Sequence, residues 1–208
     1  MTLLKRFAIL LFVPLSMLFS CTKNDSSTII LLGTESYVDD ILDVIPDSLV
    51  NTFVQYFGAI PRGYVPPNIE GSFVVTPKQR CYSNVPNWPM SIIEPNMNLS
   101  LTNQHNSVVE ISLIEANETF TDTVYVIGHD NEFTVYYQEN KLIDLVENEA
   151  QMKRGIIIKG KMGSDGIKDF MFASIIMEVK GDLYGVLAQR GQFFIYKDGD
   201  GLARKEEP

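Results

Sequence analysis

From about residue 71 onward, apolar and polar side chains alternate along the chain, which is the period of a β-strand with one buried face. Between positions 108 and 115, valine, isoleucine and leucine alternate with glutamate and serine, and residues 132 to 138 show the same period. Turn-forming residues bound many of these segments. The pattern predicts strands at 72–76, 97–102, 108–115, 123–127, 132–138, 155–161, 168–179, 186–190 and 192–196.

The sequences between these strands predict hairpins. Gly128-His129-Asp130-Asn131 is expected to form a turn in which glycine and asparagine supply left-handed backbone, and Gly163-Ser164-Asp165-Gly166 and Gly181-Asp182 are further turns. Consecutive strands joined in this way run antiparallel, and a sheet of eight to ten of them loses its exposed edges by closing on itself. The sequence therefore predicts a mainly β fold, an antiparallel up-and-down β-barrel at 71–202, with a polar tail at 203–208.

A helical period precedes the β region. Apolar side chains recur every three to four residues over 38–45, up to Pro46, and again over 49–57, up to Gly58. Such stripes are typical of helices that pack one face against a core. We predict two short amphipathic helices within 36–60 that cover the β domain as a lid or plug.

The first 20 residues have the pattern of an export signal. Lys5 and Arg6 precede an almost wholly apolar run at 7–18, which is too short for the roughly 20 residues of a membrane-spanning helix. The run leads into Leu18-Phe19-Ser20-Cys21. These four residues resemble the lipobox of bacterial lipoproteins, in which the cysteine is acylated and becomes the new N-terminus. The alternative is an ordinary secreted protein whose signal happens to end near a cysteine.

The lipoprotein resemblance implies a signal peptide at 1–20, palmitate or a similar acyl chain on Cys21, and a lipidated tether at 21–35. Thr22 follows the cysteine where lipoproteins of the inner membrane typically have aspartate, which favours the outer membrane. The chain has two cysteines. Because acylation uses Cys21, Cys81 is predicted to be an unpaired and shielded thiol.

A proline-rich connector is predicted at 61–70, and a second resemblance begins there. Residues 66–73 resemble the first-strand region of uncharacterised Bacteroidetes-type outer-membrane lipoproteins with a lipocalin-like, or calycin-like, barrel. Gly71-x-Phe73 is similar to the Gly-x-Trp of lipocalins, with phenylalanine in place of tryptophan, and Arg190 is the candidate for the arginine that packs over it. By analogy, the barrel would hold a small apolar ligand. The candidate lining residues are Phe73, Trp88, Tyr125, Phe133 and Tyr137.

Charge narrows the choice of partner. The chain has 17 lysines and arginines and 26 aspartates and glutamates. Two of the basic residues and none of the acidic ones lie in 1–20, so the mature chain would carry 15 − 26 = −11. An acidic surface disfavours nucleic acids and anionic lipid surfaces, so the membrane contact is expected through the lipid on Cys21.

Catalytic and metal-binding patterns are weak. His105 and His129 stand in polar turn sequences away from a nucleophile motif, and no histidine or cysteine spacing fits zinc. Asp198-Gly199-Asp200-Gly201 invites a calcium interpretation, but the remaining ligands of an EF-hand loop are missing, which favours a structural turn. We predict no catalytic residues, no metal site and no cofactor.

Two tripeptides, Asp47-Ser48-Leu49 and Asp122-Thr123-Val124, resemble the O-glycosylation acceptor of Bacteroidetes-type envelope proteins, which makes Ser48 and Thr123 candidate glycosylation sites.

Two functions follow as hypotheses. The first is a lipid-anchored cell-envelope protein that binds a small hydrophobic ligand in a lipocalin-like barrel. The alternative is a non-catalytic interaction or scaffold protein with a solid barrel core, which docks a protein partner in the envelope. An enzyme is the least favoured interpretation, because no catalytic motif was found.

Overall fold

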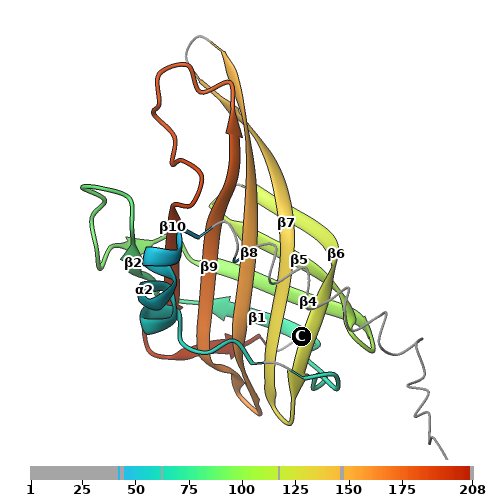
Figure 1. The fold of residues 1–208 in the computed structure, drawn as a ribbon. Coiled ribbons are helices and arrows are strands. Elements are labelled where there is room, and N and C mark those ends of the chain that lie inside the picture. Colours follow the sequence, from blue (N-terminus) through green and yellow to red (C-terminus); the bar gives the residue numbers. More distant parts are fainter. Residues whose placement is uncertain (1–41, 43–44, 62, 117, 146–147, 207–208) are drawn as a thin grey trace, which may run out of the picture.

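The computed structural model of the chain (Figure 1) describes residues 42, 45–61, 63–116, 118–145 and 148–206. This part of the chain forms one helix, α2 (Asp47–Phe57), and one antiparallel sheet of 11 strands. The strands are β1 (Gly71–Val75), β2 (Lys78–Ser83), β3 (Ile93–Glu94), β4 (Met97–His105), β5 (Val108–Glu115), β6 (Glu118–His129), β7 (Glu132–Asp144), β8 (Glu149–Gly163), β9 (Gly166–Lys180), β10 (Phe193–Asp198) and β11 (Leu202–Lys205).

Eight of the strands form a closed ring. Strands β4 to β9 are a meander in which each strand pairs with the next. β1 pairs with β4 on one side and with β11 on the other, and β11 pairs with the start of β9. β10, β2 and β3 continue the sheet beside the later part of β9. The structure confirms the prediction of a mainly β, antiparallel and barrel-like fold. Its last strand includes 203–205, which the sequence analysis assigned to a polar tail.

The connections alternate between two ends of the ring. The β4–β5, β6–β7 and β8–β9 turns lie at one end, which we call the apolar end. The β5–β6, β7–β8 and β9–β10 connections lie at the other, which we call the charged end after the side chains described below. The segment between β2 and β3 also belongs to the charged end, because β2 runs toward it.

The ring closes near two bends of the chain, each of which separates two strands. β1 and β2 lie on either side of Thr76-Pro77, and β10 and β11 lie on either side of Gly199-Asp200. The two bends adjoin, since the Gly199 amide donates to the Pro77 carbonyl at 2.8 Å. Asp198 is buried beside them and accepts hydrogen bonds from the backbone N–H of Thr76 (2.9 Å), Asp200 (3.0 Å) and Leu202 (3.3 Å). The Asp-Gly-Asp-Gly sequence therefore forms a structural bend.

Inward side chains of the ring strands form one continuous apolar core. It extends from Phe73 on β1, through Val109 on β5, to Phe133 and Ile158 on β7 and β8. Ile69, in the connector before β1, belongs to the same core and is fully buried. Its position is held by Gln104, whose side chain accepts from Ile69 N–H at 2.8 Å and donates to the Pro67 carbonyl at 2.9 Å.

Helix α2 covers the outside of the sheet (Figure 1). Its Phe53 and Phe57 are buried, and Phe53 meets Phe193 of β10 edge to face at a centroid distance of 5.3 Å. Lys159 of β8 donates to the Ala59 carbonyl at 2.6 Å, just beyond the C-terminal end of the helix. The expectation of a lid or plug is thus corrected, because α2 packs on an outer face.

Several expectations about individual elements change. The described residues contain one of the two predicted helices, since nearly all of 36–44 lies outside them. Residues 186–190, predicted as a strand, belong to the connection between β9 and β10, whereas β2, β3 and β11 had not been predicted. Within the described part of the chain, no helix is long and apolar enough to cross a membrane.

Candidate functional site: a charged layer inside the ring

Charged side chains occupy the interior at the charged end. On β5 the inward alternation of Val109, Ile111 and Leu113 continues to Glu115, and on β7 the alternation of Phe133, Val135 and Tyr137 continues to Glu139 and Lys141. β2 directs Lys78 and Arg80 to the same side, and β8 directs Arg154 there. The charged layer, as we use the term, consists of Lys78, Arg80, Glu94, Glu115, Glu118, Glu139, Lys141 and Arg154.

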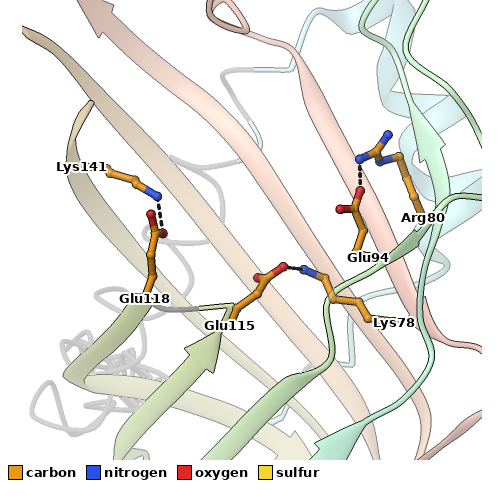
Figure 2. Close-up of polar contacts among 6 residues, drawn as sticks. All are labelled: Lys78, Arg80, Glu94, Glu115, Glu118 and Lys141. Atoms are coloured by element: carbon orange, nitrogen blue, oxygen red, sulfur yellow. Dashed lines mark hydrogen bonds and ion pairs between the residues drawn. The ribbon is translucent and has the colours of Figure 1, made fainter. Parts of the chain in front are cut away.

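Four ion pairs connect the charged layer. Figure 2 shows three of them. The pair of Lys78 and Glu115 joins β2 to β5, which are far apart in sequence. The pairs of Arg80 with Glu94 and of Lys141 with Glu118 join strands that follow one another, β2 with β3 and β6 with β7. In the fourth, Arg154 of β8 donates to Glu139 of β7 at 2.5 Å. Glu118 is largely exposed, but the cations of the other three pairs are largely buried. Burying an ion costs several kcal/mol even after relaxation, so apolar residues in place of these three pairs would stabilise this end of the ring at least as well. The layer is therefore a candidate for a functional site.

Lys78 and Arg80 are the deepest cations of the layer. The side chain of Lys78 is 4% exposed and that of its partner Glu115 is 37% exposed, while Arg80 and Glu94 are 7% and 20% exposed. Burial lowers the pKa of Lys78; Glu115 opposes this shift, and the nearby charges of Arg154 and Arg80 add to it. The three cations therefore lie close enough to influence one another.

Aromatic rings surround these two cations. Lys78 Nζ lies 4.4 Å from the ring centre of Tyr196, and the Arg80 guanidinium lies 5.4 Å from that of Trp88 and 6.0 Å from that of Phe194. Cation–π contacts of this kind offset part of the lost hydration. Burial also raises the pKa of the Tyr196 hydroxyl, which stays protonated and keeps its hydrogen to donate.

Three buried polar atoms in this region have no hydrogen-bond partner among the described residues. They are Arg80 Nε, Arg154 Nε and Ser174 Oγ. Ser174 is on β9 and lies opposite Phe194 of β10, while Arg80 lies opposite Tyr196 of the same strand. Buried donors without a partner are uncommon and costly, which marks this face of the layer as a place for a ligand or ordered water.

Three of the five predicted lining residues lie in the interior core. Phe73, Phe133 and Tyr137 are buried there, and Tyr137 stacks on Phe120 at a centroid distance of 4.7 Å. Trp88 lies at the charged end, where it meets Phe194 edge to face. Tyr125 is half exposed on the outer face, because its neighbours Val124 and Val126 point inward. Four of the five therefore lie on the inner side of the sheet, three in the interior core and Trp88 at the charged end.

The other predicted positions are placed as follows. Cys21, the signal peptide and the tether lie outside the described residues. Ser48 on α2 and Thr123 on β6 are exposed. Arg190 is exposed at the charged end, whereas Phe73 lies toward the apolar end, so the two do not pack together.

Neither the thiol nor the two histidines belong to the charged layer, and Asp198, although it lies opposite Lys78 of β2, binds backbone N–H groups of the bend. Cys81 is a half-buried free thiol whose Sγ donates to the Ile195 carbonyl at 3.4 Å. His105 and His129 are exposed at the ends of β4 and β6. Among the described residues no three histidine, cysteine or acidic side chains gather as metal ligands would.

The charged layer itself was missed in the sequence, although part of it had a signal. Extending the alternation of β5 by one step places Glu115 inward, and extending that of β7 places Glu139 inward. Lys78 and Arg80 gave no such signal, because the inward positions of β2 are themselves charged and the segment does not alternate between apolar and polar residues.

Comparison of the chain with protein-family models, with curated proteins and with solved structures identified no match.

Proposed function

We propose that the protein is a lipid-anchored binding module of the cell envelope, held by acylated Cys21 in the outer membrane, whose lipocalin-like barrel takes up a small, largely hydrophobic ligand. The observation that carries the proposal is the division of the ring interior. An apolar core fills one end, and a layer of buried charges and aromatic rings with unsatisfied donors crosses the other. An interior divided in this way suits a molecule with an apolar body and a polar group.

The anchor and the binding activity have separate tests. Replacing Cys21 by alanine should abolish incorporation of labelled palmitate and release the chain from the membrane fraction. For binding, native mass spectrometry of the protein purified from its own host should show a bound small molecule in addition to the acyl anchor. A ligand-free species that also binds nothing across a panel of lipids would contradict the binding function and leave the anchor unaffected.

A second candidate function is a scaffold that docks a protein partner of the envelope through its charged end. The observation favouring it is a set of partly to largely exposed apolar side chains on the segments around this end, namely Met90, Ile92, Ile93, Leu142, Leu183 and Val186. Isolated exposed apolar residues are normal, but several around one rim are typical of contact surfaces. Aspartate at both Ile93 and Leu183 should abolish crosslinking to one defined neighbour in cells if this function holds. Ligand binding inside the ring should survive that change.

A further inference from the structure

We infer that the charged layer binds the anionic head of an amphipathic ligand, a carboxylate or similar oxyanion carried on an apolar chain. The inference rests on the proposed binding function and adds the chemical class of the ligand.

The unsatisfied donors give the first argument. Arg80 Nε, Arg154 Nε and Ser174 Oγ can each donate a hydrogen bond, and each is buried without a partner among the described residues. Arg80 and Ser174 are both buried, with 4% of Ser174 exposed. Each of these donors requires an acceptor. An oxyanion meets that requirement, and arginine N–H groups bind carboxylates and phosphates more strongly than they bind neutral acceptors.

The placement of the donors gives the second argument. β2, β10, β9 and β8 are successive neighbours in the sheet. Arg80 on β2 lies opposite Tyr196 of β10, Ser174 on β9 lies opposite Phe194 of β10, and Arg154 on β8 lies opposite the β9 residue two positions beyond Ser174. Inward residues two apart on one strand share a face, so the three donors, on β2, β9 and β8, lie on one face of the sheet in a diagonal row that steps by two residues from one donor to the next.

Charge gives the third argument. The guanidinium of Arg80 uses its Nη atoms on Glu94 and on the Pro89 carbonyl, and Arg154 uses one Nη on Glu139, so the ion pairs leave both Nε–H donors free. In the pairs of Lys78 and Arg80 the cation is the deeper partner, so positive charge lies closest to the apolar core. A ligand whose acid meets these donors would extend its chain toward that core.

The molecule contains its own reporter. Trp88 is the one tryptophan of the chain, and its ring lies 5.4 Å from the Arg80 guanidinium and 5.4 Å from the Phe194 ring. An anion arriving at Arg80 should change its fluorescence. The experiment titrates dodecanoate, dodecanol and butyrate into the processed chain, residues 21–208, carrying Cys21→Ser to prevent acylation. At pH 8 a carboxylic acid with a pKa of about 4 to 5 is ionised. Calorimetry on the same samples supplies the dissociation constants.

The expected result is that dodecanoate binds at least about tenfold more tightly than dodecanol, as charge-assisted hydrogen bonds imply. Equal affinity for the two would overturn the head-group inference and leave the proposed binding function standing. Binding of dodecanol alone would have the same meaning. If butyrate and dodecanoate bind with equal affinity, the alkyl chain contributes nothing to binding. That result would support the anion site and contradict the hydrophobic-ligand function. Binding of none would mean that the donors hold water, and both proposals would fail.

Variants locate the head group. Ser174→Ala removes a hydroxyl that has no partner, so the free protein should fold as before while dodecanoate binds about five- to tenfold more weakly. Arg154→Met should weaken dodecanoate binding by about tenfold or more and leave dodecanol unchanged. Arg204→Met is the matched control, because Arg204 is exposed and pairs with Asp200 at 2.6 Å away from the interior. If Ser174→Ala and Arg204→Met have the same effect, the assignment of the head group to this row is wrong.

Discussion

At the scale of single residues, the same two-residue alternation that builds the core also places charges inside it. Glu115 follows Leu113 inward on β5, and Glu139 follows Tyr137 inward on β7. Each of these acids is paired with a cation from another strand, Lys78 or Arg154. Removing one partner of a buried pair leaves the other charge uncompensated, so these positions depend on one another far more than surface pairs do.

Cys81 provides a prediction at this scale. Burial raises the pKa of its thiol, and the nearby Lys197 only partly opposes that shift. The reactive thiolate is therefore scarcer at pH 8 than in an ordinary cysteine, and its rate of alkylation should rise with pH beyond the usual range. In the Cys21→Ser chain, where Cys81 is the sole thiol, iodoacetamide should label the native protein at least about tenfold more slowly than the denatured one. Mass spectrometry of timed samples measures this, and equal rates would contradict it.

At the scale of elements, the bends that join β1 to β2 and β10 to β11 depend on one carboxylate. Asp198 accepts from the backbone N–H groups of Thr76 and Asp200, and it shares the Leu202 N–H with Asp200. Asp198→Ala should lower the free energy of unfolding by about 2 to 4 kcal/mol, because it leaves the Thr76 and Asp200 N–H groups without their acceptor next to a buried strand. Asp200→Ala is the control: it removes an exposed ion pair with Arg204 and one of the two acceptors of the Leu202 N–H, which keeps Asp198, so it should cost less than about 1 kcal/mol. Urea unfolding of both variants measures the two free energies, and equal stability of the variants would contradict this role of Asp198.

Elements whose inward face is apolar could be predicted from the sequence, and the others could not. β5 was predicted at its observed bounds, because valine, isoleucine and leucine mark its buried face. β2 was missed because Lys78 and Arg80 occupy its inward positions, and β11 because it has a single inward apolar residue, Ala203. Residues 186–190 look like a strand, but the Asp182 carboxylate accepts from the Val186 and Leu187 amides and holds them in a loop.

Turn chemistry shows the same limit. The β6–β7 turn was predicted to use glycine and asparagine in left-handed conformations, yet Asp130 is the residue with φ 53°. Gly128 is instead required by space, because a Cβ there would lie 2.1 Å from the Glu132 carbonyl oxygen of the paired strand. The sequence identified the position of the turn, but the backbone conformation of each turn residue also depends on the strand that faces it. Positions that depend on a facing strand are not visible in a single local pattern.

At the scale of the whole molecule, the ring encloses the core because β11 fits between β1 and β9. Its contact with β9 covers three residue pairs, from Leu202↔Lys168 to Arg204↔Gly166. Without that contact, β1 and the start of β9 would present unpaired backbone groups and the interior core would lose one wall. The charged layer depends on the same closure, because Lys78 follows β1 around the bend and meets Glu115 from the opposite side.

Gly166 is the residue on which this closure depends most directly. Its φ is 143°, and a Cβ there would lie 2.1 Å from the Ala203 carbonyl oxygen of β11. Gly166→Ala should therefore push β11 away from β9 and lower the free energy of unfolding by about 2 kcal/mol or more. Gly163→Ala, at the other side of the same turn, would place a Cβ 3.2 Å from the flexible side chain of Lys168 and 3.3 Å from the Gly166 carbonyl oxygen, and should cost about 1 kcal/mol, less than Gly166→Ala.

The two glycine variants also distinguish closure from general weakening. If the ring is held shut by β11, amide hydrogen exchange in Gly166→Ala should rise first at Asp169 and Lys205, whose N–H groups bond across this contact to the Gly201 and Asp165 carbonyls, while the β7–β8 pairing stays protected. Trp88 fluorescence should shift as well, because loss of closure loosens β2 and the Arg80 contact that the tryptophan makes. Uniform loss of protection across all strands would show instead that the ring opens only when the whole domain unfolds, and that β11 has no separate role as a closing strand.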